Sequence, residues 1–458
     1  MKRKELTEWT LLLESLYQRF TPETLDRWAK ETQWMQRKRK LDASAFLTML
    51  LYQKGNLASD SLHELSQTFE EECHVSISAE AINQRLNERL VSFLKKCIEQ
   101  FIQTKLSYQL PIEESLQQKC QRIRIIDATV FTLPPNLKKI FPGVYRAELK
   151  CQLEYEYLTG QILLADWVAG TENDTSYGQC RLSSIQSGDL FLQDLGYFHI
   201  PTFQKIQEED AYYVSRLRPD SAVYTENPTP RYHVDGRVVK KSLYQKESLA
   251  ECLGQMERGS LKEWKKIHIG YDYKFPTRLI MYRHTEEQEK KNRDKRRDTR
   301  YQTKEHVRKL DGATLIMTNL PDTIPAEKVI ELYRLRWQIE LLFKGWKSKF
   351  PTSFYKQIKE ERVRCHVYAH LLLFLITATT TYQARLFLLE KARKEISILK
   401  GISTVLRYIR SLFLPIKKDT EVQTELMIRF HKALCRNALK TKGPPTNDPL
   451  RLLGVQYS

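Results

Sequence analysis

The stretch from Tyr333 to Lys347 places one carboxylate among cations at a spacing that suits chemistry on a phosphate chain. Read as one helix with about 100° per residue, it puts Glu340 on one stripe with Tyr333, Arg336, Lys344 and Lys347. A solvated face usually alternates charge signs to form pairs four residues apart, and this stripe does so only through Glu340 and Lys344. The stripe therefore indicates a surface for phosphates with one carboxylate left to hold a metal ion. A surface helix with a basic edge would give the same wheel. The adjoining stripe is apolar and predicts a buried face of Leu332, Leu335, Ile339, Leu342, Phe343 and Trp346.

Two aspartates lie where predicted strands would present them beside Glu340 at a common edge. Asp127 ends or interrupts one strand, and Asp194 lies on another, just before Leu195-Gly196. Ligands that offer only oxygen favour Mg²⁺ or Mn²⁺. Two such ions about 4 Å apart activate an attacking oxygen and stabilise the leaving one in an in-line displacement. An Asp at a strand end is more often a cap or turn residue, and Asp166 and Asp189 are nearby examples of that kind.

The elements that would position these acids begin near residue 120. The predicted strands share β-branched or alternating sequence and lie at residues 122–133, 147–157, 161–168, 190–198 and 211–217. A short helix is predicted at 178–187 and another at 202–208. Three strands followed by helix, strand, helix and strand is the order of a ribonuclease-H-like core. In such a sheet the first and fourth strands are neighbours, so Asp127 and Asp194 can converge.

The second half of the chain interrupts this core and then completes it. Residues 218–310 predict a β-rich insertion, with an Asp-Gly hairpin at Arg231–Val239 and strands at 267–269 and 279–282. Within the insertion, the basic segment Lys290–Arg300 indicates a solvated loop or a phosphate contact. A strand at 313–318, the helix described above and a pair of helices over 361–389 would close the core.

The ends of the chain are predicted to be helical. Near the N-terminus, Ser78 would cap a helix from Ala79 to Phe93. Its first turns carry side chains that read base edges, namely Asn83, Gln84, Arg85, Asn87 and Arg89. This layout indicates either a helix-turn-helix with Arg85 on DNA or a plain helical bundle. The C-terminal residues 390–458 form basic helices for a dimer contact or more DNA contact.

We therefore expect an α/β protein whose ribonuclease-H-like catalytic core is interrupted by a β-rich insertion and flanked by helical domains. The predicted parts are a DNA-binding domain at 1–115, core at 116–217, insertion at 218–310, core at 311–389 and a helical region at 390–458.

Composition favours a nucleic acid as the partner. The 458 residues are 41% hydrophobic and 28% charged, which is typical of a globular protein with several domains. A formal net charge of +18 favours a polyanion as partner over a merely soluble basic protein. The eight cysteines include no Cys-x-x-Cys pair, so we expect neither a structural zinc site nor a disulfide framework. We therefore expect the protein to act in the reducing cytoplasm. The apolar run Leu371–Ile376 is far shorter than the ~20 residues that span a bilayer, so we expect no membrane association.

The spacing Tyr333-x2-Arg336-x3-Glu340-x6-Lys347 is similar to the Tyr-Arg-Glu-Lys signature of bacterial cut-and-paste transposases of the insertion-sequence-four (IS-four) family. Ile126-Asp127-Ala-Thr resembles that family's first catalytic Asp motif, and Asp194-Leu-Gly-Tyr-Phe198 resembles the second. The resemblance is specific from about residue 120 to 375, is loose over the N-terminal helices, and does not extend to the C-terminal tail.

The resemblance implies a DDE transposase in which Asp127, Asp194 and Glu340 are catalytic and hold two Mg²⁺ ions, with Mn²⁺ as a substitute. Such an enzyme binds the terminal inverted repeats of an insertion sequence, cleaves both strands, in relatives through a hairpin, and joins the 3′-hydroxyl ends to target DNA. The expected partners are double-stranded DNA and a second copy of the chain in a homodimeric synapse, acting on the bacterial nucleoid in the cytoplasm.

The same resemblance implies contacts to the cleaved transposon end. Tyr333, Arg336 and Lys347 would grip phosphates, with Lys344 on the same stripe. Trp337 would stack on an unpaired or flipped base, or lie in the core as an ordinary buried tryptophan.

Three other functions remain open. The chain could be a DNA-binding protein without catalysis, although all three acids are present, or a ribonuclease-H-like nuclease without strand transfer. A tyrosine recombinase also binds DNA, but we find no set of two Arg and a His-x-x-Arg ahead of a C-terminal Tyr.

Overall fold

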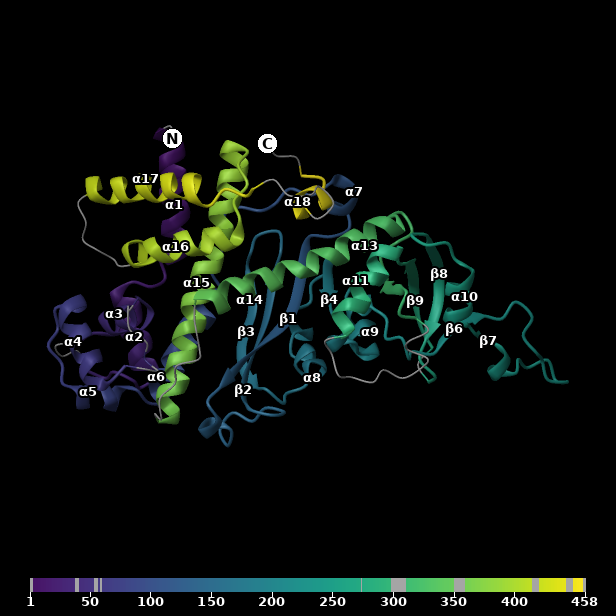
Figure 1. Ribbon diagram of the computed structural model, residues 1–458, viewed down its shortest axis with the longest axis horizontal. Helices are drawn as coiled ribbons and strands as arrows, with labels where there is room; N and C mark the ends of the chain where they lie inside the picture. The colour runs from purple at the N-terminus through teal and green to yellow at the C-terminus, as the bar shows by residue number, and fades with distance from the viewer. Residues whose placement is uncertain are drawn as a thin grey trace.

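The computed structural model describes residues 3–37, 41–52, 57, 60–272, 274–297, 310–349, 359–413, 420–441 and 448–455. The strands of these residues are β1 (Arg122–Leu133), β2 (Ala147–Glu156), β3 (Ile162–Ala169), β4 (Asp189–Gln193), β5 (Tyr212–Arg216), β6 (Val223–Glu226), β7 (Tyr244–Lys246), β8 (Leu261–Ile269), β9 (Phe275–Arg283) and β10 (Ala313–Thr318). The described strands form one mixed sheet in the order β3-β2-β1-β4-β5-β10-β9-β8-β6-β7 (Figure 1).

Helices cover this sheet and gather at its ends. The N-terminal helices are α1 (Arg3–Tyr17), α2 (Pro22–Glu31), α3 (Ala43–Tyr52), α4 (Leu62–Cys73), α5 (Ala79–Arg85), α6 (Glu88–Ile102) and α7 (Glu114–Gln117). Between strands lie α8 (Asp174–Gln179), α9 (Ile200–Glu208), α10 (Leu249–Gln255), α11 (Glu286–Arg297) and the 3₁₀ turns η2 (Leu182–Ser184) and η3 (Leu195–Tyr197). The last helices are α13 (Ala326–Arg334), η5 (Leu335–Trp337), α14 (Gln338–Lys349), α15 (Glu360–Ala392), α16 (Ile398–Phe413), α17 (Thr420–Asn437) and α18 (Pro449–Leu452).

The first half of the sheet consists of the five strands that the sequence predicts, and the predicted helix α9 lies between β4 and β5. β1 is antiparallel to β2 and β2 to β3, whereas β4 is parallel to both β1 and β5. The helix predicted at 178–187 is instead split into α8 and η2. α8 begins early because the Asn173 side chain accepts a hydrogen bond from the backbone N–H of Thr175, 3.0 Å away, and so caps the helix.

The stretch between β5 and β10 is rich in strands, as predicted, and its strands extend the same sheet. β10 is antiparallel to both β5 and β9, and β8 and β9 contain the two strands predicted there. The basic segment Lys290–Arg300, for which a loop was one prediction, is helical up to Arg297 because α11 continues through it. Glu286, Glu287 and Glu289 in the first turn of α11 favour the helix by opposing its dipole. The remainder of that segment lies outside the described residues.

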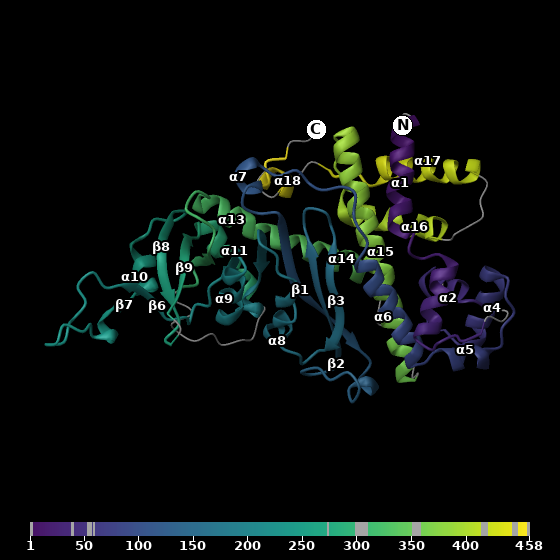
Figure 2. The same ribbon diagram turned by 180° about the vertical axis from the view of Figure 1, so that it is seen from behind.

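Helix α15 is one continuous helix of 33 residues, and the predicted pair of helices over 361–389 is therefore wrong. No glycine or proline interrupts its sequence, so nothing ends the helix before Arg393 adopts a left-handed conformation with φ +54°. α15 packs against α1, α3, α6 and α16 and against β3. It stands between the sheet and the N-terminal helices (Figure 2). By length and composition it could cross a membrane, but its apolar window is wholly buried in the protein, as expected of a core helix.

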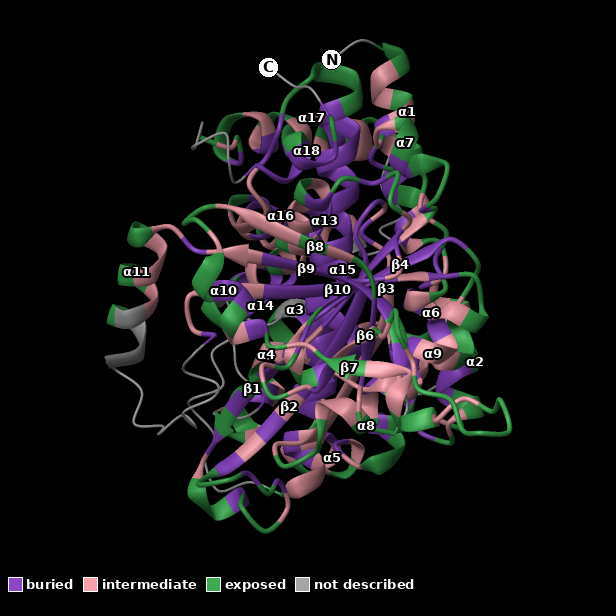
Figure 3. Ribbon diagram, turned by 90° about the vertical axis from the view of Figure 1, so that its right-hand side faces the viewer, coloured by how far each residue is buried: buried purple, intermediate pink, exposed green. Residues whose placement is uncertain are grey.

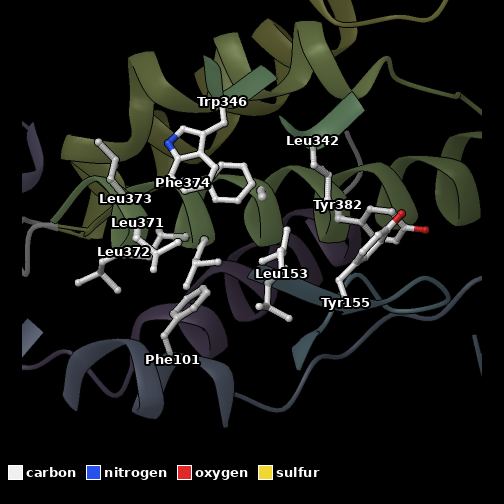
Figure 4. Close-up of a cluster of buried hydrophobic side chains, with 14 of the residues drawn as sticks. Phe101, Leu153, Tyr155, Leu342, Trp346, Leu371, Leu372, Leu373, Phe374 and Tyr382 are labelled. Atoms are coloured by element: carbon white, nitrogen blue, oxygen red, sulfur yellow. The ribbon is translucent and has the colours of Figure 1, made fainter. Parts of the chain in front are cut away.

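Aromatic stacking joins α14 to α15 and to the sheet. The Trp346 ring stacks on Phe374 with centroids 4.2 Å apart and an interplanar angle of 6° (Figure 4). The same ring meets Phe131 of β1 and Trp167 of β3 at 5.0 Å and 5.4 Å. α14 is therefore held over the sheet at a fixed height, which matters for the carboxylate near its start.

A buried ionic network lies under β1 and β4. The Arg124 guanidinium is bonded to the carboxylates of Glu154 and Asp189, at 3.0 Å and 2.9 Å, and Arg181 lies 3.5 Å from Glu154. All four side chains are about 1% exposed. Since each buried charge has a partner, the network fixes how β1, β2 and β4 meet.

The described residues before β1 form helices only, as predicted, but one helix differs. Ser78 caps α5, and its hydroxyl accepts from the N–H of Ala81. The helix predicted to reach Phe93 ends at Arg85, because the Asn87 side chain accepts from the N–H groups of Arg89 and Leu90 and starts α6. Asn87 is therefore a capping residue rather than a free reader of bases.

The C-terminal region is helical, as predicted, and packs against the N-terminal helices. α16 packs against α14 and α15, and α17 packs against α16 and α1. The Trp9 indole N–H donates to the carbonyl of Met427, 3.2 Å away. Viewed end on, buried strands fill the centre of the molecule, and the exposed segments lie mostly at its margin (Figure 3).

Candidate active site

The two aspartates stand side by side because of the register between β1 and β4. These parallel strands pair up to Ile126 and Gln193, and Asp127 and Asp194 are the next residues along each strand. Neighbouring strands lie about 4.8 Å apart, so the two carboxylates leave the sheet at one level. Asp194 directly follows β4 rather than lying within it, and it begins the 3₁₀ turn η3.

The third acid reaches this level through an interrupted helix. The predicted single helix is a run of α13, the 3₁₀ turn η5 and α14, with Arg336 in the turn and Glu340 in the first turn of α14. The Arg336 guanidinium donates from Nη1 to Asp127 Oδ2 at 3.1 Å and from Nη2 to Glu340 Oε1 at 3.0 Å. Since both carboxylates bond to one guanidinium, they lie within roughly 9 Å of each other.

Tyr333 connects the remaining acid to the same cluster. Its hydroxyl donates to Asp194 Oδ1 at 3.2 Å, and the guanidinium of Arg336 lies 5.9 Å from its ring centroid. Burial and the charge of Asp194 raise the pKa of Tyr333, so it stays a neutral donor at physiological pH. We call Asp127, Asp194 and Glu340, with Tyr333 and Arg336 between them, the acid centre.

The charged groups of the acid centre shift one another's pKa values. Burial raises the pKa of Asp127 to about 6; the N–H of Ala128 and Arg336 oppose the rise, and Asp194 and Glu340 add to it. Burial lowers the pKa of Arg336, but Tyr333 and the three carboxylates outweigh it and raise the value on balance. The centre holds three carboxylates against one internal cation.

The wheel predicted from the sequence is largely correct. The six apolar positions from Leu332 to Trp346 are all buried. Lys344 and Lys347 are exposed, with the ammonium of Lys347 5.3 Å from the ring centroid of Phe131. Trp337 is 62% exposed, so its alternative reading as a core tryptophan is wrong.

Arg85 lies apart from the acid centre. It ends α5, among the N-terminal helices beyond α15 (Figure 1). Its guanidinium donates to the carbonyl of Ala81 at 2.7 Å, within its own helix.

The aspartates set aside as structural have structural partners. Asp189 bonds to Arg122 and Arg124 in the buried network. Asp166 accepts from the N–H of Trp167 and from the hydroxyl of Tyr368.

A cleft of about 710 Å³ opens beside the acid centre and contains cations that the sequence did not single out. Asp194, Tyr333 and Arg336 form one wall, and Arg216, Arg334 and Lys291 also line the cleft. Arg216 ends β5, and this position at the end of a core strand was the available sequence signal. A second cleft of about 470 Å³ runs past Arg336, Trp337 and Glu340.

Among the described residues, no group of three or more His, Cys, Asp or Glu side chains is placed to hold a metal ion. At the acid centre the reason is visible, because the guanidinium of Arg336 stands between Asp127 and Glu340.

Comparison with known proteins shows the family of this chain. A family model described as "Transposase DDE domain" matches residues 118–376, which include all three acids. The chain therefore belongs to the DDE transposase family.

The relatives place it more narrowly. The transposase for insertion sequence element IS231B of Bacillus thuringiensis subsp. berliner is 34% identical over 459 residues, covering 98% of this chain and 96% of the relative. The transposase for IS1151 of Clostridium perfringens is 30% identical over 89% of this chain and 88% of its own length. Membership of the insertion-sequence DDE transposases, predicted from four spaced residues, is confirmed.

Among solved structures, the piggyBac transposase synaptic complex with hairpin DNA aligns with a TM-score of 0.44 and 12% identity over 95% of this chain and 86% of that one. That likeness is too weak to carry an argument about this chain.

Proposed function

We propose that this chain binds the terminal inverted repeats of its insertion sequence, cleaves both DNA strands there and joins the 3′-hydroxyl ends to target DNA. One observation carries the proposal: Arg336 bonds to the carboxylates of Asp127 on β1 and Glu340 on α14, and the neighbouring Tyr333 bonds to Asp194, which follows β4. The membership of the chain in the DDE transposase family supports a role for these acids in DNA chemistry.

The proposed catalytic core is ribonuclease-H-like and comprises residues 116–217 and 311–389. The strand order β3-β2-β1-β4-β5, with β4 and β5 parallel to β1, supports this assignment. Residues 218–310 would be its insertion, 1–115 a DNA-binding domain, and 390–458 a region for dimerisation or DNA contact.

The acid centre fits divalent cations by the chemistry of its donors. Asp127, Asp194 and Glu340 offer only carboxylate oxygens, the preferred ligands of Mg²⁺ and Mn²⁺. Burial is the main cause of the raised pKa of Asp127, and Asp194 and Glu340 add to it, so a bound cation would stabilise the charged form of this carboxylate. We propose that these three residues would hold two ions, which supply activation of the attacking oxygen and stabilisation of the leaving one.

The neighbouring side chains have separate tasks in this proposal. Tyr333 holds the Asp194 carboxylate through its hydroxyl. Arg336 balances the acids until a DNA phosphate competes for its guanidinium, which suits planar bidentate contacts. Lys344 and Lys347, both exposed, would extend the phosphate contacts along α14, and exposed Trp337 would stack on an unpaired base. Arg85 would contact DNA from the N-terminal helices, at a distance from the chemistry.

Substitution of single carboxylates tests the proposal. Glu340→Gln or Asp127→Asn should abolish Mg²⁺-dependent cleavage of a duplex that contains the transposon end, with DNA affinity and its salt dependence nearly unchanged. Glu327→Gln is the matched control, because Glu327 is exposed at the start of α13 in the same helical run and should leave cleavage intact. Cleavage that persists in both acid variants would refute the assignment.

Two product assays separate the remaining alternatives. Joining of cleaved ends to a target plasmid distinguishes a transposase from a nuclease without strand transfer. Covalently closed ends after addition of Mg²⁺ would support the hairpin route, and their absence in an active preparation would exclude that step. The proposed active form is a homodimer on two transposon ends, in the bacterial cytoplasm and on nucleoid DNA.

A further inference from the structure

A rigid hairpin projects from the insertion between β6 and β7. We call residues 227–243 the insertion arm; it reaches farther from the body than its neighbours (Figure 1). Its two limbs are joined by Tyr232 pairing with Val238, and the N–H of His233 donates to the carbonyl of Arg237 at 2.8 Å. The arm therefore has a defined shape, as the predicted Asp-Gly hairpin requires.

The turn and the base of the arm are both fixed. Asp235 accepts the N–H of Arg237 at 3.0 Å, and Gly236 has φ +81°, a conformation that favours glycine. At the base, Asn227 donates from its side chain to the carbonyl of Ser242 at 2.8 Å, and the Ser242 hydroxyl accepts the N–H of Arg231 at 2.7 Å.

The side chains of the arm are unusual for a surface that faces only water. Residues 231–237 are all exposed, including Tyr232 at 65% and Val234 at 110%. Exposed apolar side chains grouped on a projecting element are typical of a contact surface. The arm also carries cations: Arg231, Lys240 and Lys241 form no salt bridge with any residue that the structure describes, while Arg237 pairs with Asp235.

We propose that the insertion arm lies in a groove of duplex DNA that flanks the cleavage site at a distance, because the arm connects the last two strands in the sheet order, β6 and β7. This inference rests on the proposed function only in taking DNA as the substrate. A two-stranded ribbon fits the major groove, which is about 12 Å wide. Arg231, Lys240 and Lys241 would neutralise phosphates, and Tyr232 and Val234 would contact base edges and thymine methyl groups. A second copy of the chain is a poorer occupant, because two arms with excess positive charge repel each other.

Paired substitutions separate the electrostatic contribution of the arm from that of the protein as a whole. Lys240→Ala with Lys241→Ala is compared with Lys105→Ala and Lys119→Ala, which change two exposed lysines near α7. Affinity for an end duplex with flanking DNA is measured in EDTA over a range of KCl concentrations. The arm pair should lower the slope of log K against log salt by about 1 to 2 and weaken binding about tenfold, whereas the control pair should not.

The apolar tip is tested with Tyr232→Ser and Val234→Ser together, a change on exposed positions that leaves the backbone pairing of the arm in place. This variant should weaken binding and shorten the nuclease footprint on the flank without changing the salt slope. Parental affinity, slope and footprint in both arm variants would overturn the inference. Loss of a DNA-free dimer in the tip variant, with DNA binding unchanged, would assign the arm to a second copy instead. The proposed function is judged separately, since the arm variants should still cleave at saturating DNA, and a parent that fails to cleave would refute that function directly.

Discussion

Asp127 is predicted to destabilise the folded protein at neutral pH, so Asp127→Asn should make it more stable. The carboxylate is 21% exposed, and its pKa is raised from 3.8 to about 6 by burial, with Asp194 and Glu340 adding to the rise. A raised pKa means that folding disfavours the charged form of the group. Asparagine keeps the shape and an oxygen that can accept the Ala128 N–H, but it carries no charge.

The magnitude follows from the pKa shift. Each pKa unit corresponds to 1.36 kcal/mol, so the charged carboxylate lowers the free energy of unfolding by about 3 kcal/mol. The folded chain binds more protons than the unfolded chain between about pH 4 and pH 6. Stability contributed at this position therefore falls as the pH rises through that window, and the unfavourable effect is complete above pH 6.

Urea denaturation in EDTA at pH 4, 6 and 8 measures this effect. Asp127→Asn should gain up to about 3 kcal/mol over the parent at pH 8, and the gain should shrink towards zero near pH 4. Glu327→Gln, at an exposed position, is the control and should gain nothing at any pH. An Asn variant no more stable than the parent at pH 8, or a gain that does not depend on pH, would show that burial of the charge has been misjudged.

Three further substitutions test the packing and charge around the acid centre. Trp346→Ala removes the ring that stacks on Phe374, and it should lower the free energy of unfolding by about 3–5 kcal/mol in urea denaturation. Glu154→Leu leaves Arg124 short of a buried partner, and it should cost about 3–5 kcal/mol by the same measurement. Arg336→Gln removes the cation between the acids, so Mn²⁺ binding without DNA, followed by electron paramagnetic resonance, should tighten about tenfold while affinity for end DNA falls. Unchanged Mn²⁺ affinity would mean that Arg336 does not compete with the ion.

Local sequence was enough to predict what depends on side-chain periodicity. The β-branched run of β1 and the apolar stripe from Leu332 to Trp346 were correctly predicted, because burial in a sheet or against one leaves a period in the sequence. The spacing of Tyr333, Arg336, Glu340 and Lys347, together with the two Asp motifs, predicted the family. These four residues lie close together in the sequence, so their spacing can be recognised without the fold.

Features that depend on one capping side chain or on long-range charge were predicted less well. Asn87 divides the expected helix through two hydrogen bonds that any asparagine could make, so its sequence context gave no warning. The bridging position of Arg336 depends on Asp127, 209 residues away, and only the folded chain brings them together. The uninterrupted course of α15 was missed because threonines, which have a low helix propensity, stand in its middle at 377 and 379–381.

The stretch between β5 and β10 is part of how the acid centre is built, because β10 is followed by the helical run of α13, η5 and α14, which carries the third acid. β10 is fixed to β5 by the Thr318 hydroxyl, which donates to the carbonyl of Tyr213 at 2.7 Å, and by Asn319, whose side chain accepts the N–H of Tyr213 at 2.8 Å. α13 begins at Ala326, a few residues after this double attachment. The height of Glu340 over the sheet is thus set at one end by β10 and at the other by Trp346. A stretch between β5 and β10 attached only by flexible loops would give the helical run from α13 to α14 no such fixed point at its start.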